Sequence, residues 1–227
     1  MTDNPGFFGS PGINGASPYW QNAYDPLGDY GPAGYDTRNN LNATGVWQLP
    51  FGRGRRFGGG WGRWKDEALG GWQISGTALL YSGFPVTISG PNNANVNSYA
   101  SRANQYLPLK IVNRSVKNWF GTDPSATPCS GAFNGVCAYG PELPGQFGSA
   151  RVGSERAPGY RQIDLSFFKA FQVVRAQTLQ FRADMFNAFN MASYNNPDSN
   201  ISDTTFGQIT STRSPQRQTQ FSVDYQF

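Results

Sequence analysis

Five stretches of the chain alternate apolar and polar residues with a period of two, which is typical of β-strands that carry one apolar face. The most regular is the last one, RQTQFSVDYQF. Its apolar face carries Thr219, Phe221, Val223, Tyr225 and Phe227. Strands are expected at residues 38–49, 71–83, 161–172, 177–189 and 217–227. The pattern predicts an all-β fold, an antiparallel up-and-down meander of about five long strands.

The segments between these strands differ greatly in length. Residues 1–36, 90–160 and 190–216 are rich in Gly, Pro, Asn and Ser and show neither a strand nor a helix period, so they are predicted to be long surface loops. Two short strands are conceivable near them, VTIS after Pro85 and FGQITS before the last strand. The connectors at 50–70 and 173–176 are expected to be turns. Loops as long as 90–160 are unusual in compact soluble domains but common on the outer side of membrane barrels.

Composition agrees with a β-rich chain. The 227 residues include 28 glycines and 16 prolines, and 15% are aromatic but only 14% charged. No run approaches the ~18 consecutive apolar residues of a membrane helix, and the mean hydropathy is −0.51. These values remain compatible with a transmembrane barrel, because only alternate strand residues face lipid. The N-terminal MTDNPGFFGSPG lacks a secretory signal, so an exported barrel protein would be represented here by a fragment.

The residue types available for chemistry are few. Histidine is absent and the only cysteines are Cys129 and Cys137, so the usual metal sites and catalytic nucleophiles have no candidates. We therefore expect neither an enzyme nor a bound cofactor. The two cysteines lie within one predicted loop and are either a disulfide or two reduced thiols, depending on the compartment.

The connector at 50–70 holds five basic residues among glycines and aromatics. One interpretation is a nucleic-acid segment, in which arginines contact phosphates and Trp61 or Trp64 stacks on bases. The other is a solvated turn between two strands. A single short cluster lacks the repetition of nucleic-acid segments, so we favour the turn and expect no nucleic-acid partner.

Several blocks in order resemble a known family. YDTRNNLNATGVWQLPFGRGRRF, GGWQISGTALLYSGFPVTIS, DLSFFKAFQ, LQFRADMFNAFN, FGQITS and RQTQFSVDYQF are similar to the C-terminal end of a TonB-dependent receptor, of the Oar-like branch common in Acidobacteria. The resemblance implies an extracellular loop at 1–36 and a C-terminal segment of an outer-membrane β-barrel at 37–227. It further implies a role in substrate uptake for a complete receptor, whose N-terminal plug and first barrel strands would lie outside this chain. The implied partners are outer-membrane lipid, the barrel-assembly machinery and, through the missing part, TonB.

The resemblance assigns roles to particular residues. Export to an oxidising compartment favours the disulfide between Cys129 and Cys137. With the last strand descending to the periplasm, all long segments fall outside the cell and the short connectors fall in the periplasm. Lys169, on the apolar face, is expected to extend to the lipid headgroups. The barrel-assembly signal is assigned to Phe221, Val223, Tyr225 and Phe227. The periplasmic aromatic girdle is assigned to Trp47, Trp72, Phe171 and Tyr225.

Polar residues alternate with the apolar ones and are expected to face the barrel lumen. They are Gln162, Asp164, Gln180, Arg182 and Asp184. Such residues either contact a ligand or pair with one another, and pairing is the commoner case. An alternative function of another class is a secreted or surface β-sandwich that binds carbohydrate through exposed aromatic rings.

The hairpin around Val174 offers two registers. If opposed residue numbers sum to 348, Asp164 lies opposite Asp184, and like charges in direct opposition are destabilising. A sum of 350 instead places Ser166 opposite Asp184 and leaves a three-residue turn at 174–176. We therefore predict the register of 350.

Overall fold

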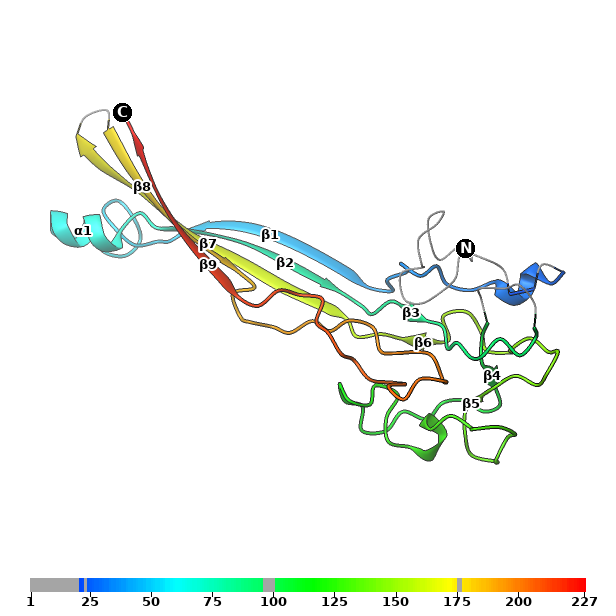
Figure 1. The fold of residues 1–227 in the computed structure, drawn as a ribbon. Coiled ribbons are helices and arrows are strands. Elements are labelled where there is room, and N and C mark those ends of the chain that lie inside the picture. The colour runs from blue at the N-terminus through cyan, green and yellow to red at the C-terminus, as the bar shows by residue number, and fades with distance from the viewer. Residues whose placement is uncertain (1–20, 23, 96–100, 175–176) are drawn as a thin grey trace. The chain divides into compact units, whose positions relative to one another are not determined.

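The structure is a computed structural model that describes residues 21–22, 24–95, 101–174 and 177–227 (Figure 1). It divides into two compact units. We call residues 39–81, 160–193 and 213–227 the strand unit, and residues 1–38, 82–159 and 194–212 the loop unit. Residues 1–20 of the predicted first loop lie outside the described part, and residues 21–36 contain one 3₁₀ turn, η1 (Pro26–Asp29).

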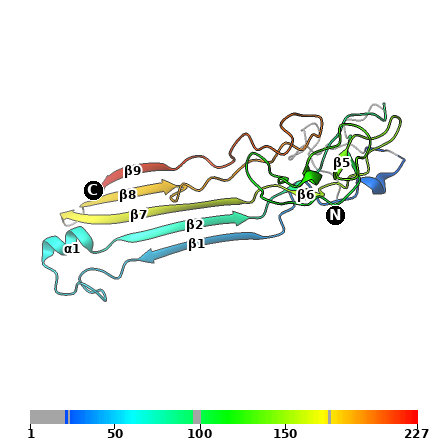
Figure 2. The ribbon, with the colours of Figure 1, turned by 90° about the horizontal axis from the view of Figure 1, so that it is seen from below.

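The strand unit is one antiparallel sheet with the strand order β1-β2-β7-β8-β9 (Figure 2). Its members are β1 (Asn40–Gln48), β2 (Gln73–Tyr81), β7 (Tyr160–Val174), β8 (Gln177–Phe186) and β9 (Gln218–Gln226). The predicted all-β meander is confirmed. The β-sandwich alternative requires two facing sheets of comparable size, whereas the other sheets of the described chain have two strands each. Strands β1 and β9 form the two edges.

The predicted hairpin register is confirmed along most of its length. Ser166 lies opposite Asp184, and Phe171 lies opposite Leu179, as a sum of 350 requires. The predicted three-residue turn is wrong, because the register shifts after Gln172 and Val174 pairs with Gln177. An extra residue in β7 produces such a bulge. Arg175 and Ala176 lie outside the described residues.

Registers across the sheet sort the side chains into two faces, since directly opposed residues share a face. One row of the first face runs across all five strands and is apolar throughout: Trp47, Ile74, Phe167, Ala183 and Phe221. A row of the opposite face is mostly polar: Gln48, Gln73, Phe168, Arg182 and Ser222. We call these the apolar face and the polar face.

Large apolar side chains of the edge strands remain exposed. On β9, Phe221 is 67% exposed and Val223 is 61% exposed, and on β1 Trp47 is 60% exposed. Water-soluble proteins rarely leave contiguous apolar patches uncovered. A lipid environment covers such a face without a second layer of protein.

The connector between β1 and β2 contains a helix that the sequence did not predict. Helix α1 (Arg63–Leu69) begins after Gly62 and ends before Gly70, whose N–H donates to the carbonyl of Asp66 at 2.8 Å. Its residues RWKDEAL are mostly good helix formers. The prediction of a plain turn was wrong because seven residues among glycines give too weak a local signal. No helix in the described residues is long and apolar enough to cross a membrane.

The loop unit has its own buried core, which the prediction of irregular loops missed. Its short elements are β3 (Pro85–Val86), β4 (Asn104–Gln105), η2 (Pro124–Ala126), β5 (Tyr139–Gly140) and β6 (Glu155–Arg156). The core consists of Val86, Ile88, Ala103, Phe120, Ala126, Ala138, Tyr139, Ala150 and Ala157. The suggested VTIS strand is reduced to Pro85–Val86. FGQITS begins with a turn at Phe206 and Gly207 and forms no strand, and an isolated bridge joins Tyr194 to Thr212 just after it.

Candidate functional site

The polar face carries a compact set of charged and polar side chains on β7 and β8, which we call the polar-face cluster: Gln162, Asp164, Ser166, Arg182 and Asp184. Arg182 Nε donates to both carboxylate oxygens of Asp184 at 2.9 Å. The hydroxyl of Ser166, directly opposite, donates to the same carboxylate. Asp184 is thus held by one donor on its own strand and one across the hairpin.

Asp164 is satisfied in a similar way. Gln162 Nε2 lies 3.0 Å from both of its carboxylate oxygens, and the backbone N–H of Asn187 donates to Oδ1 at 2.8 Å. The hydroxyl of Tyr160 in turn donates to Gln162 Oε1, and its ring stacks on that of Tyr81 with centroids 4.9 Å apart. The network therefore continues to Tyr160 and Tyr81, the first residue of β7 and the last residue of β2.

Four of the five predicted lumen-facing residues are brought together in the polar-face cluster. The fifth, Gln180, lies one row farther along β8, opposite Ala170 and Asp224. The charged groups are partnered by their neighbours, which corresponds to the pairing alternative of the sequence analysis. The predicted register already placed Ser166 opposite Asp184. Sequence reasoning missed Asn187, which follows β8 and whose role depends on how the chain turns there.

The predicted girdle residues all belong to the apolar side, but they occupy three successive rows. Trp47 lies in the row of Ile74. Trp72 precedes β2 and its carbonyl accepts from the N–H of Leu49 at 2.9 Å, one row farther. Phe171 and Tyr225 both flank Leu179, in the third row. Aromatic residues thus collect toward the end of the sheet that bears the short connectors.

The predicted assembly-signal residues lie on the last strand and its final residue. Phe221, Val223 and Tyr225 pair with Ala183, Phe181 and Leu179 of β8. The Tyr225 and Phe227 rings lie 6.1 Å apart between centroids, and Phe227 is 95% exposed. This edge therefore presents a column of large apolar side chains.

Lys169 is not where the sequence analysis expected it. Its side chain lies on the apolar face but is only 3% exposed, so it does not extend away from the protein. Its ammonium donates to the carbonyls of Asp66 and Glu67 in α1 and lies 4.7 Å from the ring centroid of Phe171. The last carbonyls of a helix have no intrahelical donors, so a cation there is favourable. The expected extension to headgroups was wrong because α1 supplies acceptors nearer by.

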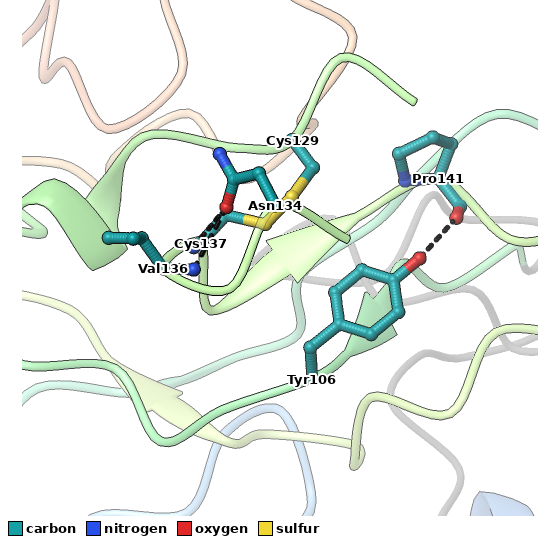
Figure 3. Close-up of a disulfide and its surroundings, with 6 residues drawn as sticks. All are labelled: Tyr106, Cys129, Asn134, Val136, Cys137 and Pro141. Carbon is teal, nitrogen blue, oxygen red and sulfur yellow. Dashed lines mark hydrogen bonds between the residues drawn. A yellow bond between two sulfur atoms is a disulfide. The ribbon is translucent and has the colours of Figure 1, made fainter. Parts of the chain in front are cut away.

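Cys129 and Cys137 form a disulfide in the loop unit, with Cα atoms 5.6 Å apart (Figure 3). The intervening turn is ordered by Asn134, whose Oδ1 accepts from the backbone N–H groups of Val136 at 2.9 Å and Cys137 at 3.0 Å. Nearby, the Tyr106 hydroxyl donates to the carbonyl of Pro141 at 3.2 Å. These contacts shape a small, covalently closed loop.

A half-buried carboxyl group lies in the same unit. The hydroxyl of Tyr139 donates to Glu155 Oε1 at 2.8 Å. Burial raises the pKa of Glu155 above its ordinary value, although the bond from Tyr139 and the charge of Arg114 oppose the shift. Burial also raises the pKa of Tyr139. In the described residues no three Asp, Glu or Cys side chains converge as metal ligands.

A sheet with one apolar and one polar face, joined by short connectors at one end and long segments at the other, is the wall of an outer-membrane β-barrel. The chain matches the family described as "Outer membrane beta barrel domain" over residues 1–220, and it belongs to that family. The protein is therefore located in the outer membrane. Comparisons with curated proteins and with solved structures gave no match.

Proposed function

We propose that this chain is the C-terminal barrel portion of a TonB-dependent receptor and takes part in substrate uptake. Family membership supports the barrel. The ordered blocks that resemble Oar-like receptors, from YDTRNNLNATGVWQLPFGRGRRF to RQTQFSVDYQF, support the finer assignment. Five strands are fewer than the ~8 of the smallest membrane barrels, so they supply one section of a larger wall.

The observation that carries the proposal is the distribution of connection lengths around the sheet. Residues 82–159 join β2 to β7, and residues 187–217 join β8 to β9 at the same end of the sheet. The other end has only the connectors after β1 and β7. Barrels of the outer membrane place long loops outside and short turns in the periplasm. Large outer loops suit a receptor that captures a scarce or bulky substrate.

The polar face supports the role of a lumen wall, because the two carboxylates of the polar-face cluster, Asp164 and Asp184, are already partnered. Arg182 with Asp184, and Gln162 with Asp164, form local pairs. A wall of this kind contacts a plug or water and need not bind substrate directly. We therefore assign substrate capture to the loop unit and give the polar-face cluster a structural role.

The gene that encodes the chain provides one test. Its sequence upstream of the codon for Met1 is expected to encode, in frame, a plug domain and a TonB box. An upstream sequence without a plug domain in frame with Met1 would contradict the proposal.

A biochemical test uses the purified C-terminal domain of TonB from the same bacterium. The complete outer-membrane protein is expected to be retained on immobilised TonB, and a version without its TonB box is expected to pass through. Equal retention of both versions, or of neither, would contradict the receptor assignment while leaving the barrel fold untouched.

A further inference from the structure

The connector between β1 and β2 is unusually basic and aromatic for a short barrel turn. Residues 50–71 contain five basic and two acidic residues, a net charge of +3 out of the chain's +4. The basic residues are all exposed: Arg53, Arg55, Arg56, Arg63 and Lys65. We call residues 50–71 the basic turn.

The basic turn is folded by its own contacts. The backbone N–H of Arg53 donates to Asp66 Oδ1 at 2.5 Å, and Arg53 Nε donates to the carbonyl of Trp61 at 3.2 Å. The ring of Phe51 stacks on that of Trp61 at 6.5 Å between centroids. One of the two acidic side chains is therefore used inside the turn, which leaves the outward surface strongly cationic.

Two side chains of the apolar side fix the turn to the sheet. Lys169 donates to the carbonyls of Asp66 and Glu67, and Trp72 Nε1 donates to the next carbonyl, that of Ala68, at 3.0 Å. Three consecutive carbonyls of α1 thus receive donors. Helix α1 therefore contacts side chains of the apolar side of the sheet. It lies just beyond the end of β1 and the start of β2 (Figure 2).

In an outer-membrane barrel the strand ends lie near the boundary between lipid tails and headgroups, so the basic turn is expected at that boundary. Exposed tryptophans and arginines favour that boundary, where rings enter the tail region and cations meet phosphates. Trp64 on α1 is 86% exposed, and Phe57 is 48% exposed with the Arg56 guanidinium 5.4 Å from its ring centroid. Aromatic and cationic groups thus project from the same turn.

We propose that the basic turn binds the phosphodiester headgroups of anionic phospholipids, such as phosphatidylglycerol, in the periplasmic leaflet of the outer membrane. Arg56, Arg63 and Lys65 supply the charge, and Trp64 inserts beside the acyl chains. The site anchors the wall at a fixed depth. It depends on the barrel fold and its orientation, and is independent of substrate uptake.

The test measures which lipids the protein retains. The complete outer-membrane protein that contains this chain is folded into bilayers of phosphatidylethanolamine with phosphatidylglycerol as the minor component, released in mild detergent and analysed by native mass spectrometry. A triple variant carries Arg56→Gln, Arg63→Gln and Lys65→Gln. Arg53 and Arg55 are kept because their side chains donate to the carbonyl of Trp61 and to Gln48 Oε1 of β1. A control carries Arg38→Gln, Lys117→Gln and Arg217→Gln, three exposed residues outside the turn.

The unchanged chain and the control are expected to retain phosphatidylglycerol in excess of its share of the bilayer. In the triple variant the phosphatidylglycerol enrichment is expected to fall about tenfold, since each basic residue near an anionic surface contributes measurably to binding. The single variant Arg63→Gln is expected to lose part of it, which keeps the test decisive if the triple variant folds poorly. Equal enrichment in all variants would overturn the proposal.

Two further arms separate other ligands of the same chemistry. Inorganic phosphate that displaces the retained lipid completely would identify a site for the free anion and overturn the lipid assignment. Loss of binding to a single-stranded oligonucleotide in the triple variant, with an unchanged lipid profile, would identify a nucleic-acid site and also overturn it.

Discussion

Replacing Lys169 with methionine tests the contact between the sheet and helix α1. Methionine keeps the length and apolar character of the side chain but removes the ammonium that donates to Asp66 and Glu67. The carbonyl of Asp66 also accepts from the N–H of Gly70 at 2.8 Å, so the loss falls mainly on Glu67. Lys169 is buried to 3% exposure, and water therefore does not readily replace the missing donor.

The expected change in the free energy of unfolding is the difference between the lost contacts of the ammonium and the gain from removing its charge. A hydrogen bond from a charged donor contributes about 1.5–3 kcal/mol. The contact with the Phe171 ring, 4.7 Å from the ammonium, adds to it. Removing a cation from the lipid-facing side near the interface stabilises the fold by roughly 0–1 kcal/mol. The net expectation for Lys169→Met is a loss of about 1–3 kcal/mol in the free energy of unfolding.

The assay is urea unfolding of the complete outer-membrane protein that contains this chain, in detergent micelles, combined with hydrogen exchange of the amides at residues 63–71. Lys169→Met is expected to lower the unfolding free energy and to accelerate exchange in α1. Lys65→Met is the matched control, because Lys65 is on the helix itself and exposed, and it is expected to leave both unchanged. A Lys169→Met variant of unaltered stability and exchange would refute the proposed contact.

Three further predictions concern assembly, solubility and pH. Phe227→Asp is expected to reduce surface display of the complete protein without reducing its synthesis, and unaltered display would contradict the assembly role of the last strand. The isolated chain is expected to aggregate without detergent, because β1 and β9 leave two unpaired edges; a monodisperse monomer in plain buffer would contradict this. Burial raises the pKa of Glu155 above 4.5, so the loop unit is expected to lose stability as pH rises from that value to the raised pKa. Glu155→Gln is expected to remove this dependence in thermal unfolding followed from acid to neutral pH, and an unchanged profile would contradict it.

The strands of the sheet and their two faces could be predicted from the sequence, because alternation with a period of two is a local property of the chain. The parity of Phe221 and Val223 determines their face without knowledge of the rest of the chain. The register of β7 and β8 followed from one electrostatic comparison, between Asp164 and Ser166 as the neighbour of Asp184. The bulge after Gln172 did not follow, because nothing in the sequence marks an extra residue at that point.

The helix and the loop core were not predictable for a different reason. Helix α1 is held by Lys169, which lies about a hundred residues away in sequence, with separations of 103 and 102 residues to its two acceptors. The loop core depends on similar long-range contacts, such as Trp119 Nε1 donating to the carbonyl of Arg156 at 2.7 Å. Its members follow no period that a sequence reading detects. The partners of the polar-face cluster fall between these cases, because strand parity identifies Ser166 but not Asn187.

The most direct test of the account is the environment of successive residues along β9 in a bilayer. Single cysteines are introduced by Gln220→Cys, Phe221→Cys, Ser222→Cys and Val223→Cys, and each is spin-labelled under non-reducing conditions that preserve the disulfide between Cys129 and Cys137. Labels at 221 and 223 are expected to collide with oxygen dissolved in lipid, and labels at 220 and 222 with a water-soluble nickel reagent. Equal access of both reagents at all four positions, or the opposite alternation, would contradict the assignment of this sheet as an outer-membrane barrel wall.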